Sequence, residues 1–153
     1  MKINHLMKPH PTRRNQAWAV DFAVLDANSR PFVMIVVDVH TRLPLSATVT
    51  PGIAEDVTAT LGRLGRRSGV PNNIWLDRGL HTRAIQNWTE ANGISIACGP
   101  SPRIKAVTEP LLRDLRGYLH DNRFPALIEL GHDIERWRQF YKTATPTVPN
   151  VNQ

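Results

Sequence analysis

The run from Phe32 to Val37, the longest apolar stretch in the chain, is the feature that most narrows its possible folds. Apolar residues without polar interruption are typical of a strand that is buried on both faces. The run is far too short to cross a bilayer as a helix. We therefore expect it to lie inside a sheet, in a strand over residues 31–39.

Strands are also predicted on either side of this segment along the chain. Residues 17–25 alternate between two faces, which is the pattern of a strand with different surroundings above and below. The polar turn cluster at 26–30 predicts that the chain returns as a hairpin. A third strand is expected at 43–49 and is closed by Pro51-Gly52. These segments predict an antiparallel meander of three strands.

Helices and strands alternate in the next part of the chain. Residues 53–67 have apolar residues at helical spacing, with acids in the first turn and arginines in the last. A short strand at 74–76 follows, then a helix capped by Thr82 and stopped by Gly93, and a last strand at 94–97. This order predicts an α/β fold with a five-stranded mixed sheet, antiparallel on one side and extended by parallel strands, flanked by helices.

The C-terminal part is expected to be a loop followed by two helices. Glycine and prolines predict the loop over 99–107, and a basic helix is expected at 109–120. A last helix covers about 126–141. The polar leader 1–15 and the proline-containing tail 143–153 are expected to be loose.

The length of the chain indicates one domain, and its positive charge indicates the kind of partner it binds. A chain of 153 residues suits one domain, expected at 16–142. The net charge is +6, and fifteen of the nineteen basic residues are arginine, which favours a polyanionic partner, usually nucleic acid. The alternative, that the charge only keeps the domain soluble, stays open. The single cysteine, Cys98, fits a reducing compartment, cytoplasmic or nuclear, and no signal peptide is expected at the N-terminus.

Three acids stand where a fold of this kind can bring them together. Asp21 lies in the middle of an alternating strand, where aspartate is disfavoured and a buried carboxylate needs an arginine or a metal ion. Asp77 ends the 74–76 strand, and the loop after the last strand returns Glu109 to the same sheet edge. Three carboxylates can bind a pair of Mg²⁺ ions about 4 Å apart, which activate a nucleophile and stabilise a leaving oxygen on phosphorus.

The constellation resembles the catalytic core of the retroviral-integrase and DDE-transposase superfamily, which has a ribonuclease H-like fold. The resemblance runs from about residue 16 to residue 120. Each motif alone is weak, but four motifs in the family's order are fairly specific. The motifs are Trp18-Ala19-Val20-Asp21-Phe22, Val36-Val37-Asp38-Val39-His40-Thr41-Arg42, Gly69-Val70-Pro71 with Leu76-Asp77-Arg78-Gly79, and Pro102-Arg103-Ile104-Lys105-Ala106-Val107-Thr108-Glu109.

The resemblance implies a catalytic, metal-binding triad of Asp21, Asp77 and Glu109 that holds two Mg²⁺ or Mn²⁺ ions. It implies DNA strand cleavage by water and strand transfer by a DNA 3′-hydroxyl, without a covalent enzyme intermediate. It also implies DNA as partner, both mobile-element ends and target, and a homodimer or higher homo-oligomer. The basic residues expected to contact DNA are Arg103, Lys105, Arg113 and Arg116.

The sequence departs from the family pattern around the third acid. The stretch between Asp77 and Glu109 is shorter than in the integrase pattern. Pro110 is expected in the first turn of a helix, which would make Glu109 a cap. Asp114 is a substitute third acid. Two other functions therefore stay open: a ribonuclease H-type Mg²⁺ nuclease, and a degenerate core that only binds DNA or a partner chain.

Other polar residues have simpler interpretations. Asp38 is expected to hold a turn or a strand end. His81 could approach a substrate, but a solvated residue at a helix start is the more common role. The arginines at 63, 66 and 67 are either a solvated helix face or further DNA contacts.

Overall fold

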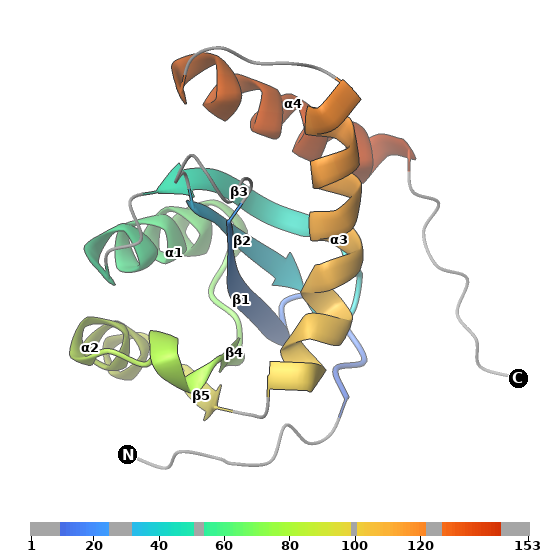
Figure 1. The fold of residues 1–153 in the computed structure, drawn as a ribbon. Coiled ribbons are helices and arrows are strands. Elements are labelled where there is room, and N and C mark those ends of the chain that lie inside the picture. The colour runs from blue at the N-terminus through green and yellow to red at the C-terminus, as the bar shows by residue number, and fades with distance from the viewer. Residues whose placement is uncertain (1–9, 25–31, 51–53, 99–100, 122–126, 145–153) are drawn as a thin grey trace, which may run out of the picture.

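The computed structural model describes residues 10–24, 32–50, 54–98, 101–121 and 127–144. A five-stranded sheet forms the centre, and helices cover both of its faces (Figure 1). In chain order, the elements are β1 (Ala17–Val24), β2 (Phe32–Asp38), β3 (Pro44–Thr50), α1 (Ala54–Ser68), β4 (Asn73–Leu76), the 3₁₀ turn η1 (Arg78–Leu80), α2 (Arg83–Ala91), β5 (Ser95–Cys98), α3 (Ser101–Asp121) and α4 (Leu127–Ala144).

The sheet has the strand order β3-β2-β1-β4-β5. β1 pairs antiparallel with β2, and β2 pairs antiparallel with β3. β4 adds to the other edge of β1 in parallel, and β5 continues in parallel beyond it. The predicted five-stranded mixed sheet is confirmed. The predicted turns at 26–30 and Pro51-Gly52 lie outside the described residues.

Alternation along β1 sorts its side chains into two buried layers. Trp18 and Val20 pack with the apolar faces of α1 and α2. Ala17 and Ala19 pack on the opposite face, with α3 and α4. Small alanines on this second face let α3 approach the strand closely. Asp21, two residues beyond Ala19, therefore faces the α3 layer.

The predicted signals of α2 are confirmed. The Thr82 hydroxyl accepts a hydrogen bond from the Ile85 N–H at 3.4 Å, which is an N-cap contact. After the helix, Gly93 has a φ of +67°, a left-handed conformation that glycine adopts without strain. The helix between them places its buried Ile85 against the sheet and leads the chain directly into β5.

The prediction of a loop at 99–107 is wrong for residues 101–107, and residues 99–100 lie outside the described residues. Helix α3 begins at Ser101 and continues without interruption to Asp121. Its buried residues Ile104, Val107 and Leu111 recur three and four positions apart and pack against the sheet. Burial of this apolar stripe outweighs the glycine and proline signals that predicted a loop.

Pro110 lies inside α3, so Glu109 is an interior helical residue and not the expected cap. A proline has no N–H, so the carbonyl of Ala106 loses its helical donor. The guanidinium of Arg42 contacts that carbonyl, with Nη1 3.4 Å from the oxygen. Arg42 itself has a φ of +62° in the turn that follows β2. A side chain from the meander thus satisfies the backbone group that the proline leaves open.

Asp38 has the structural role predicted for it. It is fully buried, and its Oδ1 accepts hydrogen bonds from the backbone N–H groups of His40 and Thr41 at 3.1 and 2.9 Å. Its Oδ2 accepts from the Asn15 N–H at 2.7 Å, and the Asn15 amide donates in turn to the Ser68 carbonyl. Asp38 therefore ties the segment before β1 to the turn before β3. Across the described ranges, no helix combines the length and the apolar character needed to cross a membrane.

Candidate active site at the carboxyl ends of β1 and β4

Two of the predicted acids lie at the same edge of the sheet. Val20 of β1 is in register with Leu76 of β4. Asp21 directly follows Val20, and Asp77 directly follows Leu76. Asp77 is half-buried at the end of its strand, where its Oδ1 lies 3.4 Å from the Gly79 nitrogen. Parallel neighbours thus place two carboxylates at adjacent strand positions, in the kind of place where α/β proteins bind ligands.

Asp21 is buried and is compensated by side chains of α3. Its residue is 6% exposed. Its Oδ2 accepts a hydrogen bond from the Thr108 hydroxyl at 2.8 Å and from the Lys105 ammonium at 3.4 Å. Its Oδ1 accepts from the Phe22 N–H at 2.9 Å. Lys105, predicted to contact DNA, thus forms an ion pair with a predicted metal ligand.

Thr108 is a site residue that sequence reasoning missed. It is fully buried, and its hydroxyl lies between the Asp21 carboxylate and the Ile104 carbonyl. Lys105 and Thr108 are three positions apart, so in a helix they share a face. That spacing was the available signal, but it had no meaning while residues 99–107 were expected to form a loop.

Glu109 does not join the other two acids. Helical geometry rotates it by about 100° from Thr108, the residue that contacts Asp21. Its Oε1 instead lies 3.2 Å from Arg116 Nη1, and both side chains are more than a third exposed. Within the described ranges, no group of three His, Cys, Asp or Glu residues can hold a metal ion. In this arrangement the three acids do not fit a two-metal site.

Asp114, the substitute third acid, has a different role. Its Oδ2 accepts a hydrogen bond of 2.7 Å from the indole N–H of Trp137. This contact joins α3 to α4, because Trp137 is buried in the layer between the two helices and the sheet. The structure therefore assigns Asp114 to packing of the C-terminal helices.

The N-terminal end of α3 is electropositive. The Arg103 guanidinium lies over the Trp75 ring, 5.7 Å from its centroid, a cation–π geometry. The His10 ring packs edge-on against the same indole. Burial, and then the positive charges of Arg42, Arg103 and His40, lower the pKa of His10 below its ordinary value of 6.5. The two arginines beside this imidazole mark a region that favours anions.

His81 differs from its expected role as a solvated residue. It is half-buried just before the Thr82 cap, and its Nε2 has no hydrogen-bond partner among the described residues. Nothing in the described site uses this nitrogen.

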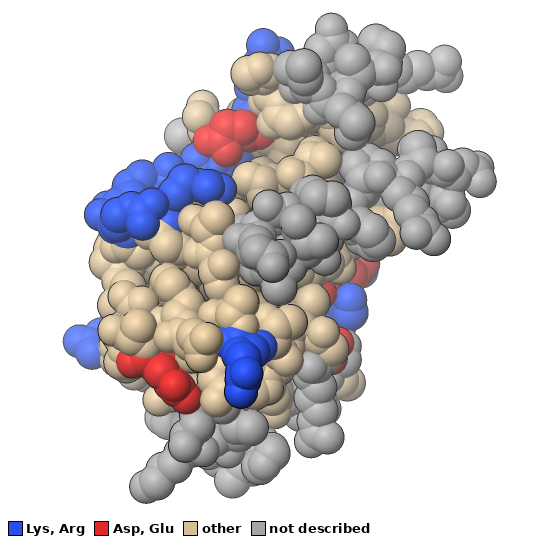
Figure 2. All heavy atoms as spheres, turned by 90° about the vertical axis from the view of Figure 1, so that its left-hand side faces the viewer, with Lys and Arg blue, Asp and Glu red and all other residues tan. Residues whose placement is uncertain are grey.

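A second basic surface lies over α1. Figure 2 shows this face, where the broadest group of Lys and Arg side chains lies at the level of α1 and other charged side chains are scattered around it. Arg63 and Arg66, from the second half of α1, line a shallow hollow together with the Trp88 side chain of α2. Arg63 also contacts the Thr60 hydroxyl at 3.0 Å. Arginines beside an aromatic ring are suited to contact phosphates and bases.

Comparison with known proteins gives a structural match. No protein-family model and no curated protein matches the sequence. Among solved structures, the chain is similar to the catalytic core domain of BIV integrase, with a TM-score of 0.71 and 18% sequence identity. The match covers 88% of this chain and 88% of that one. The chain therefore has the ribonuclease H-like fold of a retroviral integrase catalytic core.

Proposed function

We propose that this chain is the catalytic core of a DNA integrase or transposase and carries out metal-dependent DNA strand cleavage and strand transfer. One observation carries the proposal: Asp21 and Asp77 follow register-paired residues on adjacent parallel strands, in a fold similar to that of an integrase core. The buried Asp21 carboxylate has no evident packing purpose, since a strand interior disfavours aspartate.

In this proposal, Asp21, Asp77 and Glu109 are the metal-binding acids, and Mg²⁺ or Mn²⁺ is the cofactor. Bound ions would supply activation of a hydroxyl and neutralisation of charge on phosphorus. Binding requires Glu109 to leave Arg116 and Lys105 to leave Asp21. Exposed ion pairs contribute only about 0–1 kcal/mol, so separating Glu109 from Arg116 costs little. Lys105 is 48% exposed in its side chain, so its ammonium can turn to solvent, and a bound ion would replace it as the counter-charge to the buried Asp21.

The same exchange would provide cations for DNA. Once their acids take another partner, Lys105 and Arg116 become free to contact phosphates next to the reacting strand. The exposed Arg113 lies three residues from Arg116 on the same side of α3, and Arg103 adds a further exposed cation at the start of the helix. Contacts of this kind position the DNA backbone without reading its sequence. Recognition of specific ends would then come from other chains or domains, within the homodimer or higher oligomer that we propose.

The test is a strand-transfer or disintegration assay with the full chain, Mg²⁺ or Mn²⁺, and the variant Asp77→Asn. We expect joined product to fall to background, because a neutral amide is a poor ligand for a hard divalent cation. Glu90→Gln is the matched control, since it removes an exposed carboxylate on α2. Joining by Asp77→Asn at the rate of the control would refute the proposal.

A second candidate is favoured by the pairs that engage the acids. Because Lys105 neutralises Asp21 and Arg116 neutralises Glu109, the chain can also be a core that only binds DNA or a partner. A core of this kind would bind DNA in a salt-dependent way and would not bind Mn²⁺. A ribonuclease H-type nuclease predicts cleavage of an RNA–DNA hybrid without joining. Measuring hybrid cleavage and Mn²⁺ binding beside the joining assay therefore separates the three functions.

A further inference from the structure

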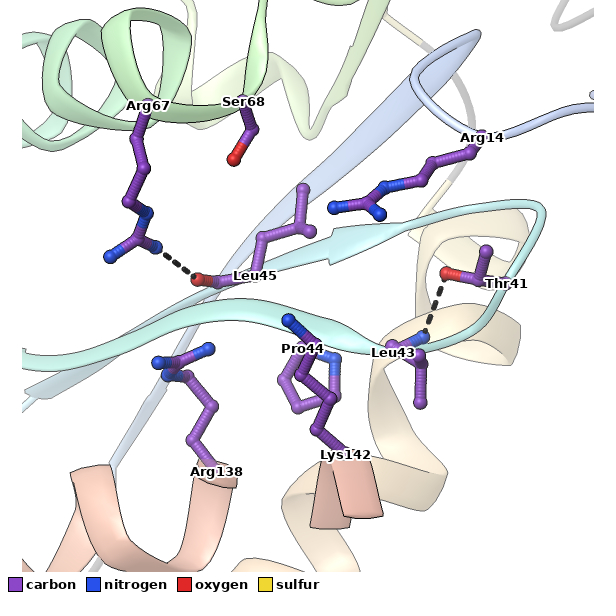
Figure 3. Close-up of a pocket in the computed structure, with 9 residues that line it drawn as sticks. All are labelled: Arg14, Thr41, Leu43, Pro44, Leu45, Arg67, Ser68, Arg138 and Lys142. Atoms are coloured by element: carbon purple, nitrogen blue, oxygen red, sulfur yellow. Dashed lines mark hydrogen bonds between the residues drawn. The ribbon is translucent and has the colours of Figure 1, made fainter. Parts of the chain in front are cut away.

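A cavity of about 300 Å³ lies at the end of the sheet away from Asp77. The first residues of β3, Pro44 and Leu45, form one wall, and Arg14, just before β1, contributes to another (Figure 3). Asp21 lies several residues further along β1, at about 3.3 Å of rise per residue. The cavity is therefore separate from the carboxylates of Asp21 and Asp77.

Four cations from distant parts of the sequence converge on this cavity. They are Arg14 before β1, Arg67 in the last turn of α1, and Arg138 and Lys142 of α4. Figure 3 shows their side chains approaching the same stretch of β3 from different sides. Folding has thus gathered like charges, which repel one another unless an anion lies between them.

One carboxylate compensates part of this charge. Glu135 forms a two-point ion pair with Arg138, whose side chain is 10% exposed. In the part of the chain that the structure describes, no carboxylate pairs with Arg14, Arg67 or Lys142. Among the described residues, Arg67 donates a hydrogen bond to the Leu45 carbonyl, with Nη2 3.4 Å from the oxygen. The charge of Arg67 also helps to lower the pKa of Glu135, although the two side chains form no salt bridge. Within the described ranges, Arg14, Arg67 and Lys142 therefore face the cavity without a carboxylate in salt-bridge contact.

We propose that this cavity binds a phosphate group, either of a small phosphate or of a nucleic-acid backbone. Guanidinium groups contact phosphate oxygens in pairs, and an ammonium adds a mobile point charge. The Ser68 side chain at the rim adds a hydroxyl donor. The volume is at the low end for ligand pockets, which suits one or two phosphate groups. The inference does not depend on strand-transfer activity.

The first test measures thermal unfolding of the full chain with added pyrophosphate, against sodium chloride of equal ionic strength. Ligand that binds only the folded state raises the unfolding temperature. We expect the double variant Arg67→Gln, Lys142→Gln to lose affinity for pyrophosphate by at least about tenfold. Arg83→Gln, which removes an exposed cation from α2, should bind like the wild type. Arg138 is left unchanged because it is buried and paired.

The second test measures binding of a labelled DNA duplex over a range of salt concentrations. If a backbone phosphate occupies the cavity, the double variant weakens DNA binding and lowers the salt slope by about 2, one for each lost phosphate contact. Weaker pyrophosphate binding with unchanged DNA binding would assign the site to a small phosphate. If the double variant changes neither, or if Arg83→Gln changes both equally, the proposal is wrong. Joining activity is not a readout, so this failure is distinct from failure of the proposed function.

Discussion

The two ends of β1 handle charge in opposite ways. At the carboxyl end, Asp21 is compensated by Lys105 and Thr108, and nearby Glu109 by Arg116. At the amino end, four cations meet around β3, and the single paired acid there among the described residues is Glu135 of α4. A ligand at the first end must therefore displace an internal partner, whereas a ligand at the second end has only to be added.

Asp38→Ala should have the largest effect on stability. The substitution leaves the N–H groups of Asn15, His40 and Thr41 without their common acceptor. His40 and Thr41 lie in the turn beside the cavity that Arg67 and Lys142 line. We expect a loss of about 3 kcal/mol in the free energy of unfolding, measured with urea. Asp38→Asn keeps one acceptor oxygen and should lose less. Equal losses for the two variants would contradict this account of the turn.

Thr108→Val tests whether the compensation of Asp21 stabilises the fold. Valine has a similar shape but cannot donate to the carboxylate, so a buried charge loses one hydrogen bond. We expect the unfolding free energy to fall by about 1–2 kcal/mol. Thr89→Val is the control, because among the described residues that buried hydroxyl donates to the Gln86 carbonyl of its own helix and contacts no carboxylate. A larger loss for Thr89→Val than for Thr108→Val would show that the Asp21 contact is unimportant.

Lys105→Met tests whether the two ends of β1 bind different ligands, a divalent cation near Asp21 and a phosphate in the cavity. The pair is partly exposed, so stability should change by less than about 1 kcal/mol. If a divalent ion competes with the ammonium for Asp21, Mn²⁺ affinity should rise several-fold by calorimetry. Lys142→Met, at the other end, should leave Mn²⁺ affinity unchanged and weaken pyrophosphate binding. The opposite pattern would mean that the two ends have been assigned wrongly.

Glu135→Gln should give the smallest effect, and one that depends on pH. The hydrogen bond from Arg138 lowers the pKa of Glu135 below its ordinary value of 4.5, against the effect of burial. A carboxyl with a depressed folded pKa stabilises the fold above its unfolded pKa, and this contribution disappears as pH falls through the folded value. Because Glu135 is nearly half exposed, we expect Glu135→Gln to lower the free energy of unfolding by about 0.5 kcal/mol at pH 7. If the stability difference between wild type and variant grew as the pH fell towards 3, the predicted direction of the pKa shift would be contradicted.

The fold was largely predictable because its signals are local. The uninterrupted run of β2, the alternation of β1 and the Thr82 cap each follow from a few neighbouring residues, and the structure confirms them. The start of α3 was not predictable from Pro110 alone. Its helix is stabilised by packing of Ile104 and Leu111 on a distant sheet, which overrides the local preference.

The site was predictable only in part. The predicted mixed sheet puts parallel strands side by side, so that Asp21 in β1 and Asp77 after β4 could be expected at the same edge of the sheet. The direction of the Glu109 side chain depends on its position around the axis of α3. That position could not be predicted, because the sequence signals placed the start of the helix near Glu109 and the helix begins at Ser101. Thr108 and Lys105 became partners of Asp21 for the same reason.

Binding of Mn²⁺ to the full chain and its acid variants tests the central claim most directly, that Asp21 and Asp77 form the metal-binding part of an active site. We predict that the wild type and Glu90→Gln bind Mn²⁺ alike by calorimetry, that Asp21→Asn and Asp77→Asn lose binding, and that Glu109→Gln binds more weakly. If the wild type fails to bind Mn²⁺, or if Asp21→Asn and Asp77→Asn bind it as tightly as Glu90→Gln, the claim is contradicted.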